Sequence, residues 1–492
     1  MEIFFTDPEA WEAAGVAEAQ KALQRHGLHA GAPFILSEDG SYDVHLNRFL
    51  WSLPTLGVRS ANSWRAYALD LLTWGRFLHE HRGKTVWQAD RDDITAFHRA
   101  RRVAPDPTQV VSASTWNRGV AALDKFYNWA TDEGLVTRTP FKYHDSSRSA
   151  DFGRQVPIRH NRAVERAARR GDVQFLSVPR YAAFRDVGLR GQRPSGATDP
   201  SFRGRNAERN VVMAELLVTT GLRIEEAASL CWPELPGPDR QDGRRSVAFD
   251  LAPPTAKRDK GRRILLPNRI VAAMADYMEI ERSLVLDRWR ARGCPLPAGA
   301  VLGSHADQRG VRMPTKDGRL RKVPWSRIAP SIRSRLFLTD EQDRLLGPAC
   351  VWLGQEARPV TLSAWESVFV RASERCRTNG FDVEATPHVL RHTFAVHLLS
   401  ALIHEQIGSV DRQDMADGVY RRIIGDPLDH LRRLLGHSSI TTTYIYLDCT
   451  DQAQSLIDGA VDAWTSEVAA TAAQVAQEVQ RPVEQVWGVN SW

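Results

Sequence analysis

Four residues near the C-terminus of this 492-residue chain have side chains that together could act on an anionic group. His388 and Arg391 follow a Thr-Pro pair that favours a helix start, and their spacing of three places both on one helix face. His437 follows a Leu-Leu-Gly run, and Tyr446 lies nine positions after it. A cation, two imidazoles and a phenol brought together would form an anion-binding site with a nucleophile beside it.

The motifs around these residues resemble those of the tyrosine recombinases, the integrases of phages and mobile elements. That family has His-x-x-Arg, then Leu-Gly-His, then the attacking tyrosine, and residue type, order and fine spacing agree here. Thr-Gly-Leu-Arg-Ile-Glu-Glu at 220–226 resembles the first arginine motif of the family, and the basic turn at 257–262 resembles its catalytic-lysine hairpin. The resemblance covers roughly residues 46–450.

The resemblance implies transesterification at a DNA phosphodiester, with Tyr446 as nucleophile and a 3′-phosphotyrosyl intermediate that needs no nucleotide cofactor. Two arginines would stabilise the charged transition state, two histidines would donate hydrogen bonds or accept the phenolic proton, and a lysine would protonate the leaving oxygen. Glu226 would orient Arg223 from one helical turn away. The implied catalytic residues are Arg223, Lys257, His388, Arg391, His437 and Tyr446.

Several alternatives stay open at this point. Lys260 competes with Lys257 for the proton-donor role, and Tyr444 competes with Tyr446 on residue type. A type IB topoisomerase would share the nucleophile and the arginines but would relax supercoils without pairing two sites, and a non-catalytic DNA-binding relative is a further possibility. The two histidines could suggest a metal site, but the neighbouring arginines would repel a cation, so we expect no metal and no cofactor.

The elements that must position these residues suggest a multidomain chain. Residues 46–145 are predicted to be all-α, because Trp64, Leu71 and Trp74 continue an apolar stripe at helical spacing and a further helix runs from Ser114 to a stop at Gly134. This order resembles the core-binding (SAM-like) domain of the integrases, one half of a C-shaped clamp around DNA. It implies phosphate contacts from Arg65, Arg118 and Lys125.

The remaining segments complete the expected organisation. Residues 1–45 are expected to be an N-terminal arm, and residues 146–175 a basic linker in which Arg159, Arg162 and Arg166 follow DNA phosphates. Residues 176–455 are expected to form a mixed, mainly helical α+β catalytic domain. We expect its strands around 247–251, 263–266 and 335–339, its helices at 268–291 and 362–378, an insertion at about 403–426, and a helical tail at 456–492.

Composition agrees with a polyanionic partner without proving one. The net charge is +6 and the pI about 9.1, while five scattered cysteines without metal-type pairing indicate a reducing compartment. No apolar run of membrane-spanning length occurs, so we expect no membrane association and a bacterial cytoplasmic protein, at the nucleoid when bound. The expected partners are double-stranded DNA at specific recombination sites, further copies of this chain as dimer and tetramer on DNA, and an accessory directionality factor.

Overall fold

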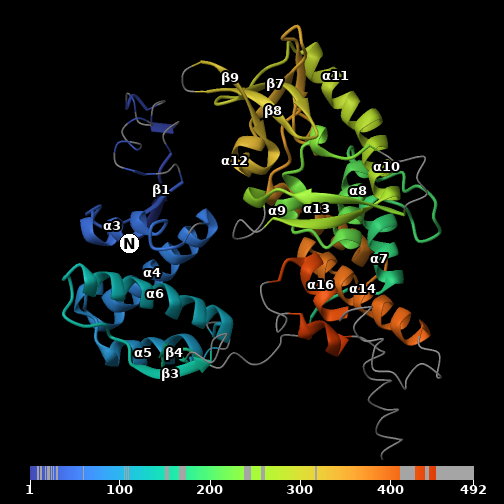
Figure 1. Cartoon of the computed structure of the whole chain (residues 1–492). Coiled ribbons are helices and arrows are strands. Elements are labelled where there is room, and N and C mark those ends of the chain that lie inside the picture. The colour runs from blue at the N-terminus through green and yellow to red at the C-terminus, as the bar shows by residue number, and fades with distance from the viewer. Residues whose placement is uncertain are drawn as a thin grey trace, which may run out of the picture. The chain divides into compact units, whose positions relative to one another are not determined.

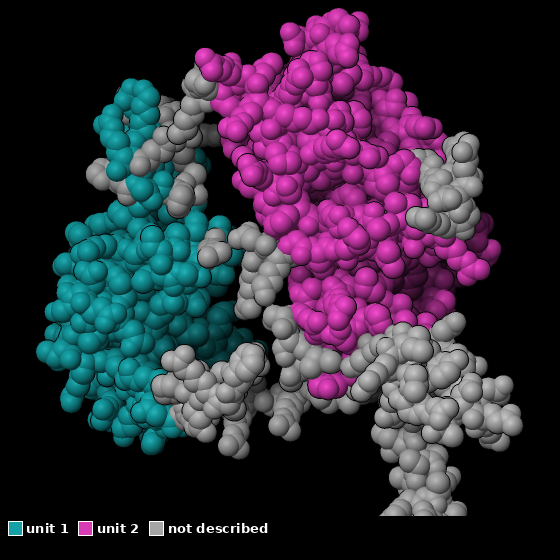
Figure 2. Space-filling view, in the orientation of Figure 1, with its two compact units in different colours: residues 1–171 teal, residues 172–492 magenta. Residues whose placement is uncertain are grey.

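The computed structural model divides the chain into two compact units, Met1–Gly171 and Asp172–Trp492, which Figure 2 shows in teal and magenta. Each unit is described by itself. The structure describes residues 1–449 except 8–9, 12–13, 17, 19–20, 22, 24, 26, 29–30, 59, 105, 107, 109, 150–154, 166–172, 238–244, 256–260, 316–317, 410–426 and 438–442. Among the described residues, no helix is long and apolar enough to cross a membrane.

The first unit is a helical bundle flanked by two short antiparallel strand pairs (Figure 1). Its elements are β1 (Glu2–Phe5), β2 (Pro33–Leu36), α3 (Val44–Ser52), α4 (Ala61–Arg82), the turn η1 (Val86–Gln88), α5 (Arg91–Arg102), α6 (Ala113–Asp132), β3 (Tyr143–Ser149) and β4 (Gln155–Asn161). The predicted helices are confirmed, and the predicted stripe of α4 is buried at Trp64, Leu71 and Trp74.

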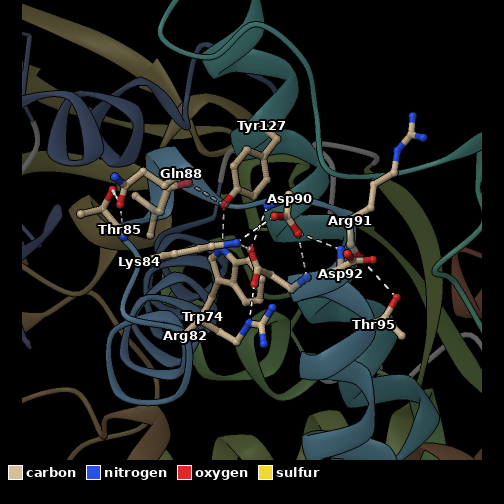
Figure 3. Close-up of polar contacts among 12 residues, drawn as sticks. Trp74, Arg82, Lys84, Thr85, Gln88, Asp90, Arg91, Asp92, Thr95 and Tyr127 are labelled. Atoms are coloured by element: carbon tan, nitrogen blue, oxygen red, sulfur yellow. Dashed lines mark hydrogen bonds and ion pairs between the residues drawn. The ribbon is translucent and has the colours of Figure 1, made fainter.

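Buried polar groups fix the geometry of this bundle. Trp74 Nε1 donates to the Tyr127 hydroxyl at 2.7 Å, and that hydroxyl donates to the Val86 carbonyl at 2.8 Å, so α4, α6 and η1 are joined (Figure 3). Asp93 is fully buried and pairs with Arg82 at 2.6 Å and Lys84 at 2.8 Å. These contacts satisfy groups that would otherwise be costly to bury.

The two segments predicted to flank the first domain contact it in the structure. Ile35 of β2 lies in the core with the helices, so this part of the predicted N-terminal arm packs on the first domain and belongs to the same unit. Likewise, β3 and β4 occupy much of the expected linker, and Glu165 accepts hydrogen bonds from Arg102 at 2.8 and 3.0 Å. Charge composition alone could not reveal these contacts. Within the arm, the sequence also predicts a helix from Pro8 to His26, and this segment lies mostly outside the described residues.

The second unit combines helices with two separate sheets. Its helical elements are α7 (Val178–Ala183), η4 (Phe184–Leu189), α8 (Ala207–Thr220), α9 (Ile224–Ala228), η5 (Trp232–Glu234), η6 (Pro253–Thr255), α10 (Asn268–Tyr277), η8 (Met278–Arg282), α11 (Ser283–Ala291), η9 (Trp325–Arg327), α12 (Pro330–Arg333), α13 (Leu362–Thr378), α14 (Pro387–Ser409), α16 (Pro427–Leu435) and η12 (Tyr444–Cys449). The predicted mixed, mainly helical α+β architecture is confirmed.

Antiparallel strands β5 (Ser246–Leu251) and β6 (Arg262–Pro267) form the predicted hairpin. A five-stranded sheet has the order β11-β10-β7-β8-β9, built from β7 (Val301–Asp307), β8 (Gly310–Pro314), β9 (Leu320–Pro324), β10 (Leu336–Thr339) and β11 (Leu345–Pro348). Of this sheet, the sequence predicted only the β10 region. The main core lies among α8, α10, α13 and the first turn of α14, and a smaller one joins α14, α16 and η12.

Candidate active site

The turn between α8 and α9 holds Arg223. Gly221 adopts a φ of +63°, which glycine tolerates and which ends α8, so that Arg223 becomes the N-cap of α9. Its backbone N–H donates to Glu226 Oε2 at 2.8 Å, and its guanidinium donates to Glu226 Oε1 at 2.9 Å. The Arg223 side chain is 27% exposed, so it is fixed at its base and still reachable by a ligand.

Arg391 projects from the first turns of α14 into the interior. Thr386 caps this helix as predicted, because its hydroxyl accepts from the Val389 N–H at 3.2 Å. The Arg391 guanidinium donates to the Gly221 carbonyl and, at 2.6 Å, to the Leu435 carbonyl. It therefore connects the α8–α9 turn to the end of α16. Burial, together with the nearby Arg223, lowers the pKa of Arg391 to about 10, so it stays protonated at neutral pH.

Glu226 joins a second arginine to this assembly. Its carboxylate is 1% exposed and accepts both Nη1 and Nη2 of Arg262, from the start of β6, at 2.8 and 2.7 Å. Burial alone would raise the pKa of Glu226, but the contacts from Arg262 and Arg223 outweigh it and lower the pKa. Arg262 Nε also donates to the Leu434 carbonyl at 2.8 Å. One carboxylate thus holds α9, β6 and α16 together.

Tyr446 lies on η12 beside two histidines, and a third histidine packs on one of these two. Its hydroxyl is 2.9 Å from His392 Nδ1, and its ring centroid is 6.2 Å from that of His437. The rings of His388 and His392, one helical turn apart on α14, have centroids 4.3 Å apart. Thr443 Oγ1 lies 3.0 Å from His437 Nδ1 and fixes that ring. The phenol therefore lies beside two imidazoles. It also lies close enough to Arg391 to raise the pKa of that guanidinium slightly, against the larger effect of burial.

Two half-buried imidazoles of this cluster, those of His392 and His437, are neutral at pH 7. Burial, together with His388 and Arg391, lowers the pKa of His392 from 6.5 to about 4. Burial, together with Arg391, Arg223 and Arg262, lowers the pKa of His437 to about 4 as well. A neutral imidazole has one unprotonated nitrogen, so each ring can accept a proton or donate a hydrogen bond.

The structure distinguishes the two tyrosines of η12. Tyr446 is 1% exposed and packs in the core of α14 and α16 with Leu399, Leu431 and Leu435. Tyr444 is 41% exposed. Only Tyr446 is in hydrogen-bond contact with a histidine of α14, which agrees with the expected preference for Tyr446 over Tyr444.

Comparisons with known proteins match both units. A family model described as phage integrase, N-terminal SAM-like domain, matches residues 46–134, and one described as phage integrase family matches residues 200–406. Tyrosine recombinase XerD of Mycobacterium tuberculosis is 32% identical over 394 residues, which is 79% of this chain and 87% of XerD. The chain belongs to the tyrosine recombinase family.

Other relatives agree with this assignment. Tyrosine recombinase XerC of Roseiflexus castenholzii is 26% identical over 392 residues, which is 79% of this chain and 83% of XerC. A crystal structure of the XerH site-specific recombinase bound to palindromic difH substrate covers 87% of this chain and 92% of that chain, at 14% identity and a TM-score of 0.46. The family models and the XerC and XerD relatives identify the protein as a site-specific recombinase, so the predicted family and enzyme class are confirmed.

Most of the predicted site residues of this recombinase come together in the second unit. Arg223, Arg391, His437 and Tyr446 are linked through Gly221, Leu435 and the histidine cluster, and Glu226 contacts Arg223 as expected. His388 is exposed and packs on His392. Lys257 and its rival Lys260 lie outside the described residues, between η6 and β6. Their roles stay predictions.

The residues predicted to bind DNA in the first unit have varied surroundings. Arg118 makes a two-pronged contact with Asp70 at 2.9 and 3.0 Å, and Lys125 donates to the Leu56 carbonyl at 3.0 Å. The Arg65 guanidinium lies over the Phe5 ring. A hollow of about 550 Å³ is lined by basic residues that include Arg159 and Arg162, together with Arg91, Arg138 and Lys142. Arg166 lies outside the described residues.

Two residues of the site were missed by sequence reasoning. His392 directly follows Arg391 and lies four positions after His388, so helical spacing could have placed it beside the other histidine. Arg262 is the last residue of the basic turn at 257–262, from which only the two lysines were predicted to have a role in the site. Its bidentate partner Glu226 lies 36 positions away, and only the folded structure shows this pairing.

Proposed function

We propose that this recombinase cleaves and rejoins DNA through a 3′-phosphotyrosyl bond on Tyr446. The tyrosine oxygen forms a bond to phosphorus while the bond from phosphorus to the 5′-oxygen breaks, so the energy of the phosphodiester is kept for rejoining. The observation that carries this proposal is the 2.9 Å contact between the Tyr446 hydroxyl and Nδ1 of His392, whose imidazole is neutral at pH 7. In the tautomer protonated at Nε2, His392 Nδ1 accepts the phenolic proton.

The arginines supply the electrostatic part of the reaction. The charge of a phosphoryl transition state grows on the non-bridging oxygens, and preorganised donors in a partly dry site stabilise it most. Arg223 has a partly exposed guanidinium held by Glu226, and Arg391 is held by two backbone carbonyls, so neither has to reorganise. His388 and His437 contribute further hydrogen bonds, and Lys257 protonates the leaving 5′-oxygen. This chemistry requires neither a metal nor ATP.

Tyr446 must become accessible before it can react. Its side chain is 1% exposed, and a phosphate cannot reach the hydroxyl while the tyrosine is packed against α14 and α16. We infer that η12 shifts when the substrate binds. Exchange between two duplexes needs two cleavages in each, so we also propose that four chains assemble on two paired sites, with the tail at 456–492 as a contact between protomers.

Covalent trapping tests the nucleophile. The full chain is incubated, in EDTA and without ATP, with a pool of nicked duplexes of randomised sequence. The short fragment between the cleavage site and the nick then leaves with its freed 5′-hydroxyl, and the strand cannot be rejoined. We expect a denaturant-resistant protein–DNA adduct from the wild type and from Tyr444→Phe, and none from Tyr446→Phe. An adduct of normal yield from Tyr446→Phe would assign the nucleophile elsewhere, and strict dependence on a divalent ion would contradict the mechanism.

A further inference from the structure

The hairpin of β8 and β9 has an unusual concentration of positive charge. Residues 309–327 contain seven basic residues and one acidic residue, a balance equal to the +6 of the whole chain. Arg312 lies directly opposite Lys322, and Met313 lies opposite Arg321. The basic residues described here are all exposed, namely Arg309, Arg312, Arg319, Arg321, Lys322 and Arg327.

Most of this charge has no partner within the described part of the chain. Lys322 pairs with Asp307, whereas the guanidinium groups of four arginines make no ion pair or hydrogen bond with any described residue, namely those of Arg309, Arg312, Arg321 and Arg327. Like charges directly opposite each other destabilise a strand pair. The arrangement of Arg312 opposite Lys322 therefore costs stability in the free protein and indicates an anionic partner.

Protection of a sheet edge explains only part of this pattern. β9 is the outer strand, and lysine and proline on an outer strand, here Lys322 and Pro324, prevent pairing with another chain. Arg312, however, lies on β8, one strand inside the edge, Arg309 lies in the turn before β8, and Arg327 lies beyond the end of β9. Protection of the edge requires none of these three arginines.

The base of the hairpin is attached to the segment that leads to the proposed proton donor. η9, which follows β9, packs against η6, and residue 256 follows η6 directly in the sequence. A hollow of about 360 Å³ is lined by Leu251 and Pro253 from one side and by Arg309 and Trp325 from the other. In Figure 1 the strands of the hairpin extend away from the helices α10 and α13 of the same unit.

We propose that the β8–β9 hairpin binds the sugar-phosphate backbone of duplex DNA beside the cleaved site. The inference rests on the proposed function, because it takes DNA as the substrate. A strand of five residues spans about 17 Å, which matches roughly five base pairs of duplex. Long basic side chains on both faces of an outer strand pair can reach phosphates along this length without reading the bases.

Salt-dependent binding tests the hairpin. The variant Arg309→Gln/Arg312→Gln/Arg321→Gln of the full chain is titrated with a labelled duplex of arbitrary sequence at several salt concentrations. The slope of log K against log salt is negative, and each lost phosphate contact reduces its magnitude by about 0.9. Three lost contacts therefore reduce the magnitude by about 2.7. We expect weaker binding at low salt and this flatter slope.

Two further variants separate local charge from net charge and from packing. Arg290→Gln/Arg292→Gln/Arg344→Gln removes the same formal charge from arginines that are paired with Asp287, Glu356 and Asp340, and it should keep the wild-type slope. Replacing the three hairpin arginines by lysine should keep most of the affinity for DNA, because a contact with a backbone phosphate depends more on positive charge than on the bidentate geometry of a guanidinium. The proposal is overturned if the glutamine variant keeps wild-type affinity and slope, or if the lysine variant loses as much as the glutamine variant.

The failure of this proposal can be distinguished from failure of the proposed function. Trapping of a covalent adduct by the wild type reports the nucleophile, whereas the salt slope reports phosphate contacts in the absence of chemistry. If the wild type forms the adduct and the hairpin variant keeps the wild-type salt slope, only the hairpin proposal is contradicted. If Tyr446→Phe forms the adduct in unchanged yield and the hairpin variant has a flatter slope, only the proposed mechanism is contradicted.

Discussion

At the scale of single residues, the carboxylate of Glu226 determines where two arginines lie. Arg223 is available to a ligand, while the Arg262 side chain is 8% exposed and donates its hydrogen bonds to Glu226 and to the Leu434 carbonyl. Arg262 is therefore a positioning residue, which acts on the substrate through Glu226 and Arg223. A buried pair of this kind is expensive to break, because the remaining charge has no compensation.

We predict that Arg262→Lys lowers the rate of covalent adduct formation at least about tenfold, equal to about 1.4 kcal/mol in the barrier, with little change in DNA affinity. A lysine cannot donate to both carboxylate oxygens and to the Leu434 carbonyl at once. Single-turnover cleavage and equilibrium binding measure the two effects separately. Arg263→Lys is the matched control, because Arg263 is 69% exposed and pairs with Asp250. Equal rates for the two variants would make Arg262 structural.

Residue types and spacing predicted the residues to which we assign direct chemical roles, and the structure brings most of the described ones together. It could not predict Arg262 or the Tyr446–His392 contact, since these depend on how β6 and η12 pack against α9 and α14. The same limit holds for β7, β8 and β9, whose short strands show no regular alternation of buried and exposed positions. Long helices with one apolar face, such as α4, were predictable from periodicity.

At the scale of elements, the end of α16 must approach β6 closely. Gly436 has a φ of +65°, and a Cβ atom there would lie 2.9 Å from Arg262 Cδ. The glycine thus lets the helix end in a left-handed turn while the arginine passes beside it. His437 is the next residue in the chain, so the position of its imidazole depends on the turn at Gly436.

We predict that Gly436→Ala lowers both stability and cleavage, because the added methyl group pushes Arg262 away from Glu226. The matched control is Gly293→Ala, which has a similar φ of +79° and nothing within 4 Å of the added atom. The control bears only the backbone strain, about 1 kcal/mol, and should cleave normally. Thermal unfolding and adduct formation compare the two. Identical cleavage rates would show that the close approach has no influence on the reaction.

At the scale of the whole molecule, the two units have separate cores and different titrating groups. His392 and His437 lie in the second unit with pKa values of about 4, below the ordinary 6.5. Between these values an unfolded chain binds protons that the folded unit does not, so the stability of the second unit falls as pH falls from 6.5 to 4. In the first unit, hydrogen bonding by Lys84 lowers the pKa of Asp90 to about 2, so its stabilising effect is lost only below its ordinary 3.8.

We predict that calorimetry of the full chain shows one unfolding transition that moves to lower temperature between pH 6.5 and 4.5 more than the other does. In His392→Asn/His437→Asn that transition should become less sensitive to pH, since the groups that resist protonation are gone. Transitions that shift in parallel in both proteins would contradict this assignment of the acid-sensitive groups.

The burial of Tyr446 also has a consequence for the cell that makes this enzyme. A DNA-breaking protein is a hazard to a genome whenever its reactive group meets the wrong duplex. With only 1% of Tyr446 exposed, a free chain shields the group that we propose as the nucleophile, so we expect non-specific encounters to leave the strand intact. On this proposal, the free energy needed to expose the tyrosine limits cleavage to sites whose binding can supply it.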